Sequence, residues 1–270
     1  LLKLGGSLIT DKERPDTARR EVIRRLAGEI AGALRGPGAL RLVLGHGSGS
    51  FGHTAAARLR LGAESQGEGG PEGVSRVQER AAALHRQVLD ALLAEGASPF
   101  SVAPSSVLVA AGGLPVRCEA EPLLLALEGG LLPVVYGDVV MDRERGYAIA
   151  STEAVFLALA EELGRHGVRI ARALWAGATD GVLGRGGERL EEVRADAAEA
   201  ALAAAGGAAG TDVTGGMRHR LEAALELARR GVPSLVFDGG VPGRLAAALR
   251  GELAPGTRVV PGSGYRRAVR

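Results

Sequence analysis

Short apolar runs alternate with amphipathic stretches along most of this chain. Continuous apolar runs of this kind are typical of strands that are buried on both faces of a sheet. Because strands and helical patterns alternate, we expect an α/β fold with an open, mainly parallel, doubly wound sheet and helices on both faces. The predicted strands are Leu1–Leu4, Leu40–Gly45, Phe100–Ala103, Leu131–Tyr136, Ile170–Trp175, Pro233–Phe237 and Thr257–Val260.

Apolar residues at helical spacing predict four helices between these strands. We expect Asp16 or Thr17 to cap the first helix at its N-terminus. Gly96 and Gly231 are the expected stops of the second and fourth helices. The four apolar stripes run from Ile23 to Leu34, from Leu84 to Leu92, from Phe156 to Leu163 and from Leu221 to Ala228.

Three stretches interrupt this alternation. Residues 107–118 predict a β-hairpin with a Gly-Gly turn, and residues 61–73 and 183–210 have the Gly-rich composition of mobile loops or lids. Within the last stretch, DAAEAALAAAGGAAG (196–210) also fits a helix that runs into a flexible loop. The length of 270 residues suits one large α/β domain or two small ones. We expect a single domain over residues 1–270, with two lobes at roughly 1–150 and 151–270.

The composition argues against several classes of function. Aromatic residues make up only 3% of the chain, too few for a platform that stacks single-stranded nucleic acid. With a formal net charge of +2 and no basic run, we expect no binding to nucleic acid or to an anionic membrane. A single cysteine, Cys118, and the lack of an apolar run of roughly 18 residues favour a cytoplasmic protein.

Four glycine-containing segments follow predicted strands or precede predicted helices. Glycine amides approach a ligand closely, and loops of such amides bind phosphate groups. Ligands bind at the carboxyl ends of parallel strands, so we expect the four segments to converge on one edge of the sheet. They are KLGGSLITDK (3–12), GHGSGSFGH (45–53), YGDVVMD (136–142) and TDVTGGMRHR (211–220).

Lysine is rare in this chain and occurs only beside one glycine turn. Of the 33 lysine and arginine residues, Lys3 and Lys12 are the two lysines. Lysine is a compact point charge that binds phosphate, and the planar arginine fork does not replace it at a tight site. Two phosphate-binding loops with two lysines indicate two phosphate-bearing ligands, which is the arrangement that a kinase needs.

The segments KLGGSLITDK, GHGSGSFGH and DVTGGM together resemble the isopentenyl phosphate kinases, a branch of the amino-acid kinase superfamily. DTARR (16–20) and YGDVV (136–140) extend the similarity, which covers most of the chain in the same order. The combination of GSFGH with ITDK is specific, whereas the KxGGS turn marks only the superfamily. The resemblance implies ATP-dependent phosphorylation of isopentenyl phosphate to isopentenyl diphosphate for isoprenoid biosynthesis, by a homodimer that uses ATP and Mg²⁺.

The same resemblance implies roles for individual residues. Lys3 contacts the ATP phosphates and Lys12 lies near the transferred γ-phosphate. His53 donates a hydrogen bond to the acceptor phosphate, and Glu153 orients the lysines. Residues 1–150 form the acceptor-binding lobe and residues 151–270 the nucleotide-binding lobe. The implied ATP-binding residues are Lys3, Gly5, Gly6, Ser7, Asp180, Gly181, Gly215, Gly216 and Arg220, and the implied substrate-binding residues are Gly47, Gly49, Ser50, Gly52, His53, Gly137 and Asp138.

Some of these residues have a second, structural interpretation. We expect His46 to be a structural histidine that bonds to backbone. Trp175 ends an apolar strand and is expected in the core. Asp138 is either a turn-stabilising carboxylate or a residue of the site. No protein ligand to a metal is expected, because few carboxylates accompany the lysines and Mg²⁺ would be held by nucleotide phosphates.

The chain departs from the family pattern at three places. The family commonly has SGD at the start of a helix, whereas this chain has Ser151, Thr152 and Glu153. The family's TDVDG is GATDG here, and only Asp180 and Gly181 match. The lysine that usually follows DVTGG is Arg220.

Two alternative functions remain open at this stage. A fosfomycin kinase shares the fold and a similar histidine but phosphorylates a small phosphonate. The altered segments are also compatible with a non-catalytic nucleotide-binding protein, although both lysines are retained. The size of the acceptor pocket distinguishes an isopentenyl phosphate kinase from a fosfomycin kinase, because an isoprenoid tail needs an apolar slot. The helical stripe Val74, Val77, Ala81, Leu84 and Val88 either lines such a slot or is ordinary core.

Overall fold

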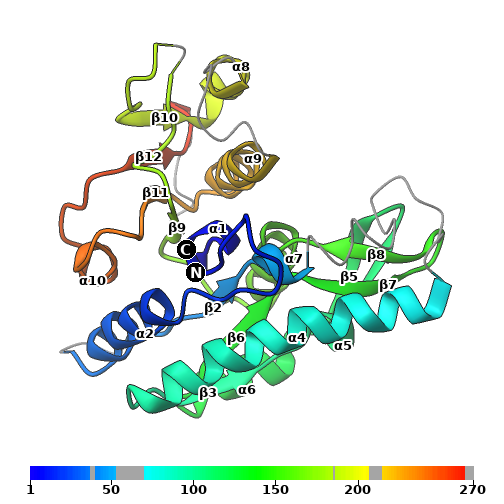
Figure 1. Cartoon of the computed structure of the whole chain (residues 1–270). Helices are drawn as coiled ribbons and strands as arrows, with labels where there is room; N and C mark the ends of the chain where they lie inside the picture. Colours follow the sequence, from blue (N-terminus) through cyan, green and yellow to red (C-terminus); the bar gives the residue numbers. More distant parts are fainter. Residues whose placement is uncertain (37–39, 53–69, 185, 207–214, 265–270) are drawn as a thin grey trace.

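A computed structural model describes residues 1–36, 40–52, 70–184, 186–206 and 215–264. In these residues an eight-stranded sheet crosses the molecule, and helices cover both of its faces (Figure 1). Neighbouring strands are parallel except β11 and β12, so the predicted open, mainly parallel sheet is confirmed. The strand order is β10 (Glu192–Arg194), β12 (Thr257–Val260), β11 (Ser234–Asp238), β9 (Ala173–Gly177), β1 (Leu2–Leu4), β2 (Leu44–His46), β6 (Leu132–Tyr136) and β3 (Pro99–Ser101).

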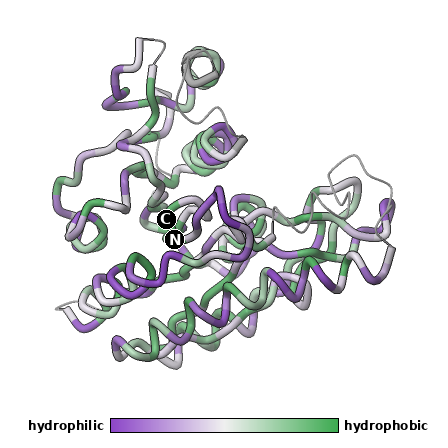
Figure 2. Tube along the Cα trace, viewed as in Figure 1, coloured by the Kyte–Doolittle hydropathy of each residue, from purple (hydrophilic) through white to green (hydrophobic). Residues whose placement is uncertain are grey.

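Two groups of helices pack on the two faces of this sheet. One face carries α2 (Arg20–Leu34), α4 (Gly70–Ala94) and α10 (Arg244–Arg250), and the other carries α7 (Thr152–Arg165) and α9 (Gly215–Arg229). Along α2 and α4 hydrophobic and hydrophilic residues alternate, as expected for helices that bury one side (Figure 2). Shorter helices are α1 (Gly6–Ile9), α5 (Pro104–Val107), α6 (Glu121–Glu128) and α8 (Ala198–Gly206).

Alternate residues of the central strands enter different hydrophobic cores. In β9, Leu174 and Ala176 join the core under α2, α4 and α10, whereas Ala173 and Trp175 join the core under α7 and α9. Trp175 is fully buried, and its ring lies 5.9 Å from the ring of Phe156, so its predicted place in the core is confirmed. Because both faces of each strand are covered, these strands are continuous apolar runs.

A second sheet of four strands stands beside the main one. Its order is β5 (Leu114–Cys118), β4 (Leu108–Ala111), β7 (Asp138–Asp142) and β8 (Gly146–Ala150). The predicted Gly-Gly hairpin is confirmed as β4 and β5, with Gly112 and Gly113 at positive φ in the turn. The β7–β8 hairpin was not among the predicted elements. It connects β6 to α7 and brings Ile149 and Ala150 toward the edge where β1, β2 and β6 end.

The start of α2 differs from the predicted start. The helix begins at Arg20, and neither Asp16 nor Thr17 caps it: the residue at the cap position is Arg19, which makes no side-chain cap bond. The expected cap is therefore wrong. Residues 11–17 instead form a loop that is closed by an antiparallel bridge between Thr10 and Ala18 and by the bond from Arg19 N to Ile9 O at 2.8 Å. This tertiary closure outweighs the local capping preference. The helix stops at Gly96 and Gly231 are confirmed, both at positive φ.

The two stretches predicted as loops or lids have more regular structure than expected. Residues 61–69 lie outside the described residues, while Gly70–Gly73 already belong to α4. The stretch 183–210 contains the strand β10, which the loop prediction missed, and the helix α8, which agrees with the helix expected at the start of residues 196–210. The alanine-rich sequence of α8 is a strong helix former, which explains why a helix forms there. None of the helices in the described residues has the length and apolar character needed to cross a bilayer.

Candidate active site

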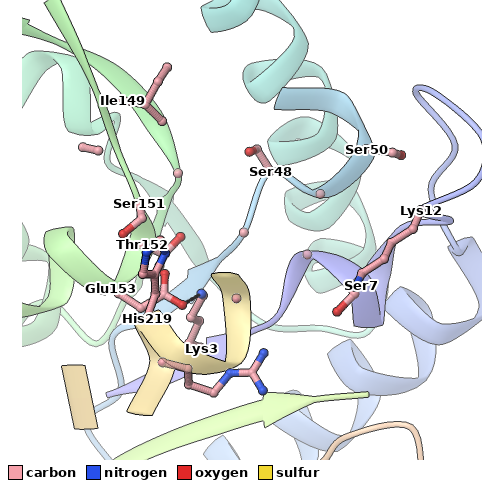
Figure 3. Close-up of a pocket in the computed structure, with 17 residues that line it drawn as sticks. Lys3, Ser7, Lys12, Ser48, Ser50, Ile149, Ser151, Thr152, Glu153 and His219 are labelled. Carbon is pink, nitrogen blue, oxygen red and sulfur yellow. Dashed lines mark hydrogen bonds and ion pairs between the residues drawn. The ribbon is translucent and has the colours of Figure 1, made fainter. Parts of the chain in front are cut away.

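Residues from all four glycine-containing segments line one cleft, at the carboxyl ends of β1, β2 and β6. The expected convergence on one sheet edge is therefore confirmed within the described part of the chain. Lys12 and Ser7 lie on the side of the cleft opposite Glu153 and His219 (Figure 3). The cleft has a volume of about 480 Å³ and is lined by Lys3, Gly6, Ser7, Lys12, Gly47, Ser48, Gly49, Ser50, Gly137, Ile149, Ala150, Ser151, Thr152, Glu153, Gly216, His219 and Arg220.

Two glycine loops form the floor of the cleft. The first glycine loop (residues 5–7) follows β1, and the second glycine loop (residues 47–50) follows β2. Their backbones touch: a Cβ atom at Gly6 would lie 2.7 Å from the nitrogen of Gly49, closer than real Cβ contacts. Gly49 itself has a φ of 51°, which favours glycine. Thr10 holds the loops together, because its hydroxyl donates to Gly6 O at 2.8 Å and accepts from Ser50 N at 3.0 Å.

Lys3 lies in the centre of β1, between two residues of the opposite core. Leu2 and Leu4 both enter the core under α2 and α4. Because side chains alternate along a strand, Lys3 points to the other face, where α7 and α9 pack. There its ammonium group donates a hydrogen bond to the Glu153 carboxylate, and both side chains are more than nine-tenths buried (Figure 3). The predicted pairing of this acidic residue with a lysine of the first segment is thus present in the structure.

Burial and charge act on this pair in opposite directions. Burial lowers the pKa of Lys3, because the ammonium group loses its hydration; Glu153 opposes this effect and Arg220 adds to it. Burial alone would raise the pKa of Glu153, but the charge and hydrogen bond of Lys3, with the charge of Arg220, outweigh it and lower that pKa. Glu153 therefore stays ionised and holds Lys3 in one position.

The N-terminus of α7 connects Glu153 to the second glycine loop. Ser151 caps the helix by accepting a hydrogen bond from Ala154 N at 3.2 Å. The next residue, Thr152, stands where the family has glycine, and its hydroxyl donates to the carbonyl of His46 at 2.7 Å. This bond gives the departure from the family pattern a structural role, because it ties α7 to the end of β2.

Lys12 reaches the cleft from the loop that precedes α2. Asp11 N donates to Thr17 O at 2.9 Å, which closes the base of this loop beside Lys12. Ser7 lies next to the Lys12 side chain in the view of Figure 3. Among the described residues that line the cleft, Lys3, Lys12 and Arg220 are basic and Glu153 is acidic. The excess positive charge suits the binding of anions.

Several predicted site residues lie near the cleft but do not line it. Gly5 is the first residue of the first glycine loop, and its N–H donates to Ala176 O of β9 at 2.8 Å. Gly52 donates to Ser48 O at 3.3 Å in the helical turn that follows the second loop. Asp138 is 2% exposed, and its carboxylate accepts hydrogen bonds from Ser105 N and Val139 N at 3.2 and 2.8 Å. Burial raises the pKa of Asp138, against these hydrogen bonds.

Three more predicted residues lie on the nucleotide side in the sequence-based assignment. Asp180 forms ion pairs with Arg189 and Arg244, away from the lining of the cleft. Gly181 packs against Thr257. Gly215 begins α9, one residue before the cleft residue Gly216.

His53, the predicted ligand of the acceptor phosphate, lies outside the described residues, as do residues 212–214 of the DVTGG segment. The apolar stripe on α4 divides in two. Leu84 and Val88 belong to the main core, whereas Val77 packs against Val139 of the second sheet with Val74 and Tyr147 beside it. Within the described residues this stripe does not line the cleft.

Sequence reasoning missed some residues of the cleft. His219 is exposed in the second turn of α9 and lines the same cleft as Glu153 and Thr152 (Figure 3). Its position in TGGMRHR, one residue before Arg220, was the available signal. Ile149 belongs to the unpredicted β7–β8 hairpin and supplies an apolar side chain to the rim.

Comparisons with known proteins agree with this geometry. Residues 1–238 match the model of the amino acid kinase family. The isopentenyl phosphate kinase of Methanothermobacter thermautotrophicus is 35% identical over 271 residues, which cover 96% of this chain and 98% of that protein. The isopentenyl phosphate kinase of Haloferax volcanii is 35% identical over 261 residues, which cover 95% of this chain and 96% of that protein.

Solved structures show the same relationship. An X-ray structure of an isopentenyl phosphate kinase superimposes with a TM-score of 0.77 at 30% identity, covering 95% of this chain and 98% of that chain. A second one, a substrate complex, shares the fold with a TM-score of 0.74 at 24% identity, over 96% of this chain and 98% of the other. The chain therefore belongs to the amino acid kinase family, and within it to the isopentenyl phosphate kinases.

Proposed function

We propose that this chain transfers the γ-phosphoryl group of ATP to isopentenyl phosphate, which yields isopentenyl diphosphate and ADP for isoprenoid biosynthesis. The observation that carries this proposal is the direct contact between the two glycine loops at Gly6 and Gly49. Two loops of a kind that binds phosphate open into one cationic cleft, so two phosphate-bearing ligands are brought end to end. Relatives that are 35% identical over nearly the whole chain are kinases of this substrate.

The chemistry needs charge stabilisation more than proton transfer. The acceptor phosphate has a second pKa of about 6, so its attacking oxygen is already ionised near neutral pH and no general base is required. That oxygen forms a bond to the γ-phosphorus while the bond to the ADP oxygen breaks. Lys3, held by Glu153, and Lys12, on the opposite side of the cleft, would stabilise the negative charge on the transferring group.

The residues of the cleft also suit a particular way of holding Mg²⁺. No group of three or more His, Cys, Asp or Glu side chains that would hold a metal ion occurs among the described residues. Glu153, the acidic residue in the described lining, is already paired with Lys3. These donors fit a Mg²⁺ ion that is bound chiefly by the nucleotide phosphates and neutralises their charge.

The division of labour between the two lobes is part of the same proposal. Gly216 and Arg220 come from residues 151–270 and would contact the nucleotide, together with Gly5, Gly6 and Ser7. Gly47, Gly49, Ser50 and Gly137 come from residues 1–150 and would surround the acceptor phosphate. We assign the hydrogen bond to that phosphate to His53, as the family resemblance predicts. The resemblance also predicts a homodimer, which light scattering of the purified protein would test, and the composition predicts a cytoplasmic location.

A coupled ADP-release assay tests the function directly. Isopentenyl phosphate, dimethylallyl phosphate and fosfomycin are compared as acceptors at equal concentration, with ATP and Mg²⁺. We expect the highest kcat/KM with isopentenyl phosphate. Turnover of fosfomycin alone would favour the phosphonate kinase, and ADP release that no acceptor increases would contradict a transferase of this kind.

A further inference from the structure

A chain of hydrogen-bonded side chains lies directly behind the second glycine loop. His46, at the end of β2, is fully buried, and its Nδ1 lies 3.2 Å from Gly47 O. Its Nε2 lies 3.0 Å from Nδ1 of His85, which comes from α4. Nε2 of His85 lies 2.8 Å from the hydroxyl of Ser101 on β3. Neither histidine lines the cleft.

The chemistry of the groups determines the direction of this chain. A carbonyl oxygen only accepts hydrogen bonds, so His46 must carry its proton on Nδ1 and donate to Gly47 O. In a neutral imidazole the other nitrogen is then an acceptor, so His85 must donate from its own Nδ1. Nε2 of His85 is left as an acceptor for the Ser101 hydroxyl. Both histidines are therefore Nδ1–H tautomers, and each ring nitrogen has a partner.

The surroundings keep both rings neutral. Burial lowers the pKa of His46 to about 4, assisted by the charge of Lys3, and lowers that of His85 to about 3, assisted by His46 and Arg86. Both rings also stack with the ring of Tyr136 from β6, whose centroid lies 4.2 Å from that of His85. On this ring, the Tyr136 hydroxyl donates a hydrogen bond to the Asp138 carboxylate.

His46 is hydrogen-bonded to three residues that line the cleft, namely Gly47, Gly137 and Thr152. Its backbone carbonyl accepts from Gly137 N at 3.1 Å, as well as from the Thr152 hydroxyl. Its side chain fixes Gly47, whose N–H donates to Leu4 O at 3.0 Å. A Cβ atom on Gly47 would lie 2.8 Å from Gly6 N, so Gly47 has no freedom to move toward the first loop. A shift of the His46 ring therefore moves the backbone of the second loop.

We propose that His46 and His85 are positioning residues that fix the register of α4 against the second glycine loop and so set the acceptor phosphate site. The proposal rests on the function proposed above for the acceptor end of the cleft. The pair holds the loop through a directed hydrogen-bond chain, and neither side chain touches the substrate.

The tautomers provide a test that does not depend on activity. Nitrogen-15 NMR of the histidine side chains in the full chain, with His46→Asn and His85→Asn used for assignment, distinguishes Nδ1–H from Nε2–H. We expect both rings to be neutral Nδ1–H tautomers from pH 5.5 to 8. An Nε2–H tautomer at either position would overturn the proposal. The tautomers can be determined whichever substrate the enzyme phosphorylates.

Kinetics of two His85 variants test the positioning role. The amide nitrogen of asparagine occupies nearly the same place as Nδ1 of histidine, so His85→Asn keeps the donor to His46, whereas His85→Leu removes it. We expect His85→Leu to raise the KM for isopentenyl phosphate about tenfold, the effect of one lost hydrogen bond, with the KM for ATP within twofold of wild type. His85→Asn should stay within about threefold of wild type.

The controls distinguish failure of this proposal from failure of the proposed function and from unfolding of a variant. His166→Leu replaces an exposed histidine that follows α7 and should leave both KM values unchanged. Equal effects of His85→Leu on the two substrates, or no effect, would overturn the positioning role. If His85→Leu does not fold, the NMR tautomers and His85→Asn decide the question. If wild-type protein fails to phosphorylate isopentenyl phosphate, the proposed function fails while the tautomer result remains interpretable.

Discussion

The two glycine loops of the cleft are supported from behind in different ways. Behind the first loop, Lys3 is paired with Glu153 next to Arg220, so charged groups are buried together. Behind the second loop, the His46–His85 pair is buried and neutral, with each nitrogen hydrogen-bonded. Both supports lie next to loops that contact phosphate groups in the function we propose, yet one adds charge to the cleft and the other does not.

The difference follows from what each support must do. A lysine in the floor of the cleft can stabilise charge that develops during phosphoryl transfer, but only if a carboxylate compensates for its burial. A loop that binds through backbone amides needs only a fixed shape, and neutral hydrogen bonds provide it without a charge that would change with pH. Substitution in the charged support should therefore lower the free energy of unfolding the most. The neutral support should be detected mainly by a loss of stability in acid, where its histidines would have to bind protons.

Loss of Glu153 should have the largest effect. Glu153→Gln leaves Lys3 buried beside Arg220 without its counter-charge, and breaking a buried pair in this way costs about 3–5 kcal/mol. We expect a decrease of this size in the free energy of unfolding, measured by urea denaturation. Glu161→Gln on the same helix removes an exposed partner of Arg165 and should cost less than about 1 kcal/mol.

A double variant separates stability from activity at this pair. Lys3→Met with Glu153→Leu replaces two buried charges by apolar side chains of similar volume, which is often neutral for stability. We expect stability near that of wild type and no detectable turnover. A double variant as unstable as Glu153→Gln would contradict the view that the unpaired charge causes the loss.

Lys12 should affect turnover more than stability, because it is exposed at the rim of the cleft. If it stabilises the transferring phosphoryl group, Lys12→Ala should lower kcat by roughly 10² or more, the effect of losing one preorganised donor. Arg14→Ala removes a charge from the same loop without touching the cleft and is the matched control. Steady-state kinetics at saturating ATP and isopentenyl phosphate measure both, and similar kcat values for the two variants would contradict the assignment.

The neutral pair should make the protein less stable in mild acid. The pKa values of His46 and His85 are about 4 and about 3 in the folded protein, below the value of about 6.5 for an unfolded chain. Below pH 6.5 the unfolded chain therefore binds protons that the folded protein does not, and stability falls as the pH is lowered toward 4. Each histidine contributes up to about 1.4 kcal/mol per pH unit in this range.

The double variant His46→Asn, His85→Asn tests this slope. Other titrating groups are common to both proteins, so the difference between the two curves of unfolding free energy against pH reports the two histidines. We expect the wild-type curve to be steeper between pH 6 and 4.5 and the curves to be parallel above pH 7. Parallel curves over the whole range would show that the pair is protonated in the folded protein.

The sequence predicted the large features of the fold for a physical reason. Strands β6 and β9 of the main sheet are buried along their whole length, so nearly every residue in them is apolar and the runs stand out. β8 shows the opposite case: it is partly exposed, and its sequence GYAIA carries little signal. The cap of α2 was predicted wrongly because a bridge between Thr10 and Ala18, a tertiary contact, determines where that helix begins.

The residues that line the cleft were predictable where a short stretch of the sequence carries the signal. Lys3 and Lys12 are conspicuous in a chain that otherwise uses arginine, and glycine loops after strands indicate phosphate binding. The His46–His85 contact joins residues that are 39 positions apart, on a strand and a helix, so no local sequence pattern predicts it. His219 likewise depends on how α9 packs beside α7, since a single histidine on a helix has no periodicity of its own.

Substitution of His219 should have the smallest effect on the kinetics. It tests whether the side of the cleft with Lys3 and Glu153 binds the nucleotide, because His219 is an exposed imidazole that lines the cleft near these residues. If it donates a hydrogen bond to a nucleotide phosphate, His219→Ala should raise the KM for ATP about three- to tenfold, as for one hydrogen bond at an accessible site. The KM for isopentenyl phosphate should stay within twofold. His219→Gln keeps a donor of similar reach and should recover most of the affinity.

Competitive inhibition by ADP then locates the contact of His219. An unchanged Ki for ADP in His219→Ala assigns the hydrogen bond to the γ-phosphate, whereas an increase in Ki that parallels the increase in the KM for ATP assigns it to the α- or β-phosphate. An increase in the KM for isopentenyl phosphate instead would place His219 on the acceptor side and contradict the division of the cleft.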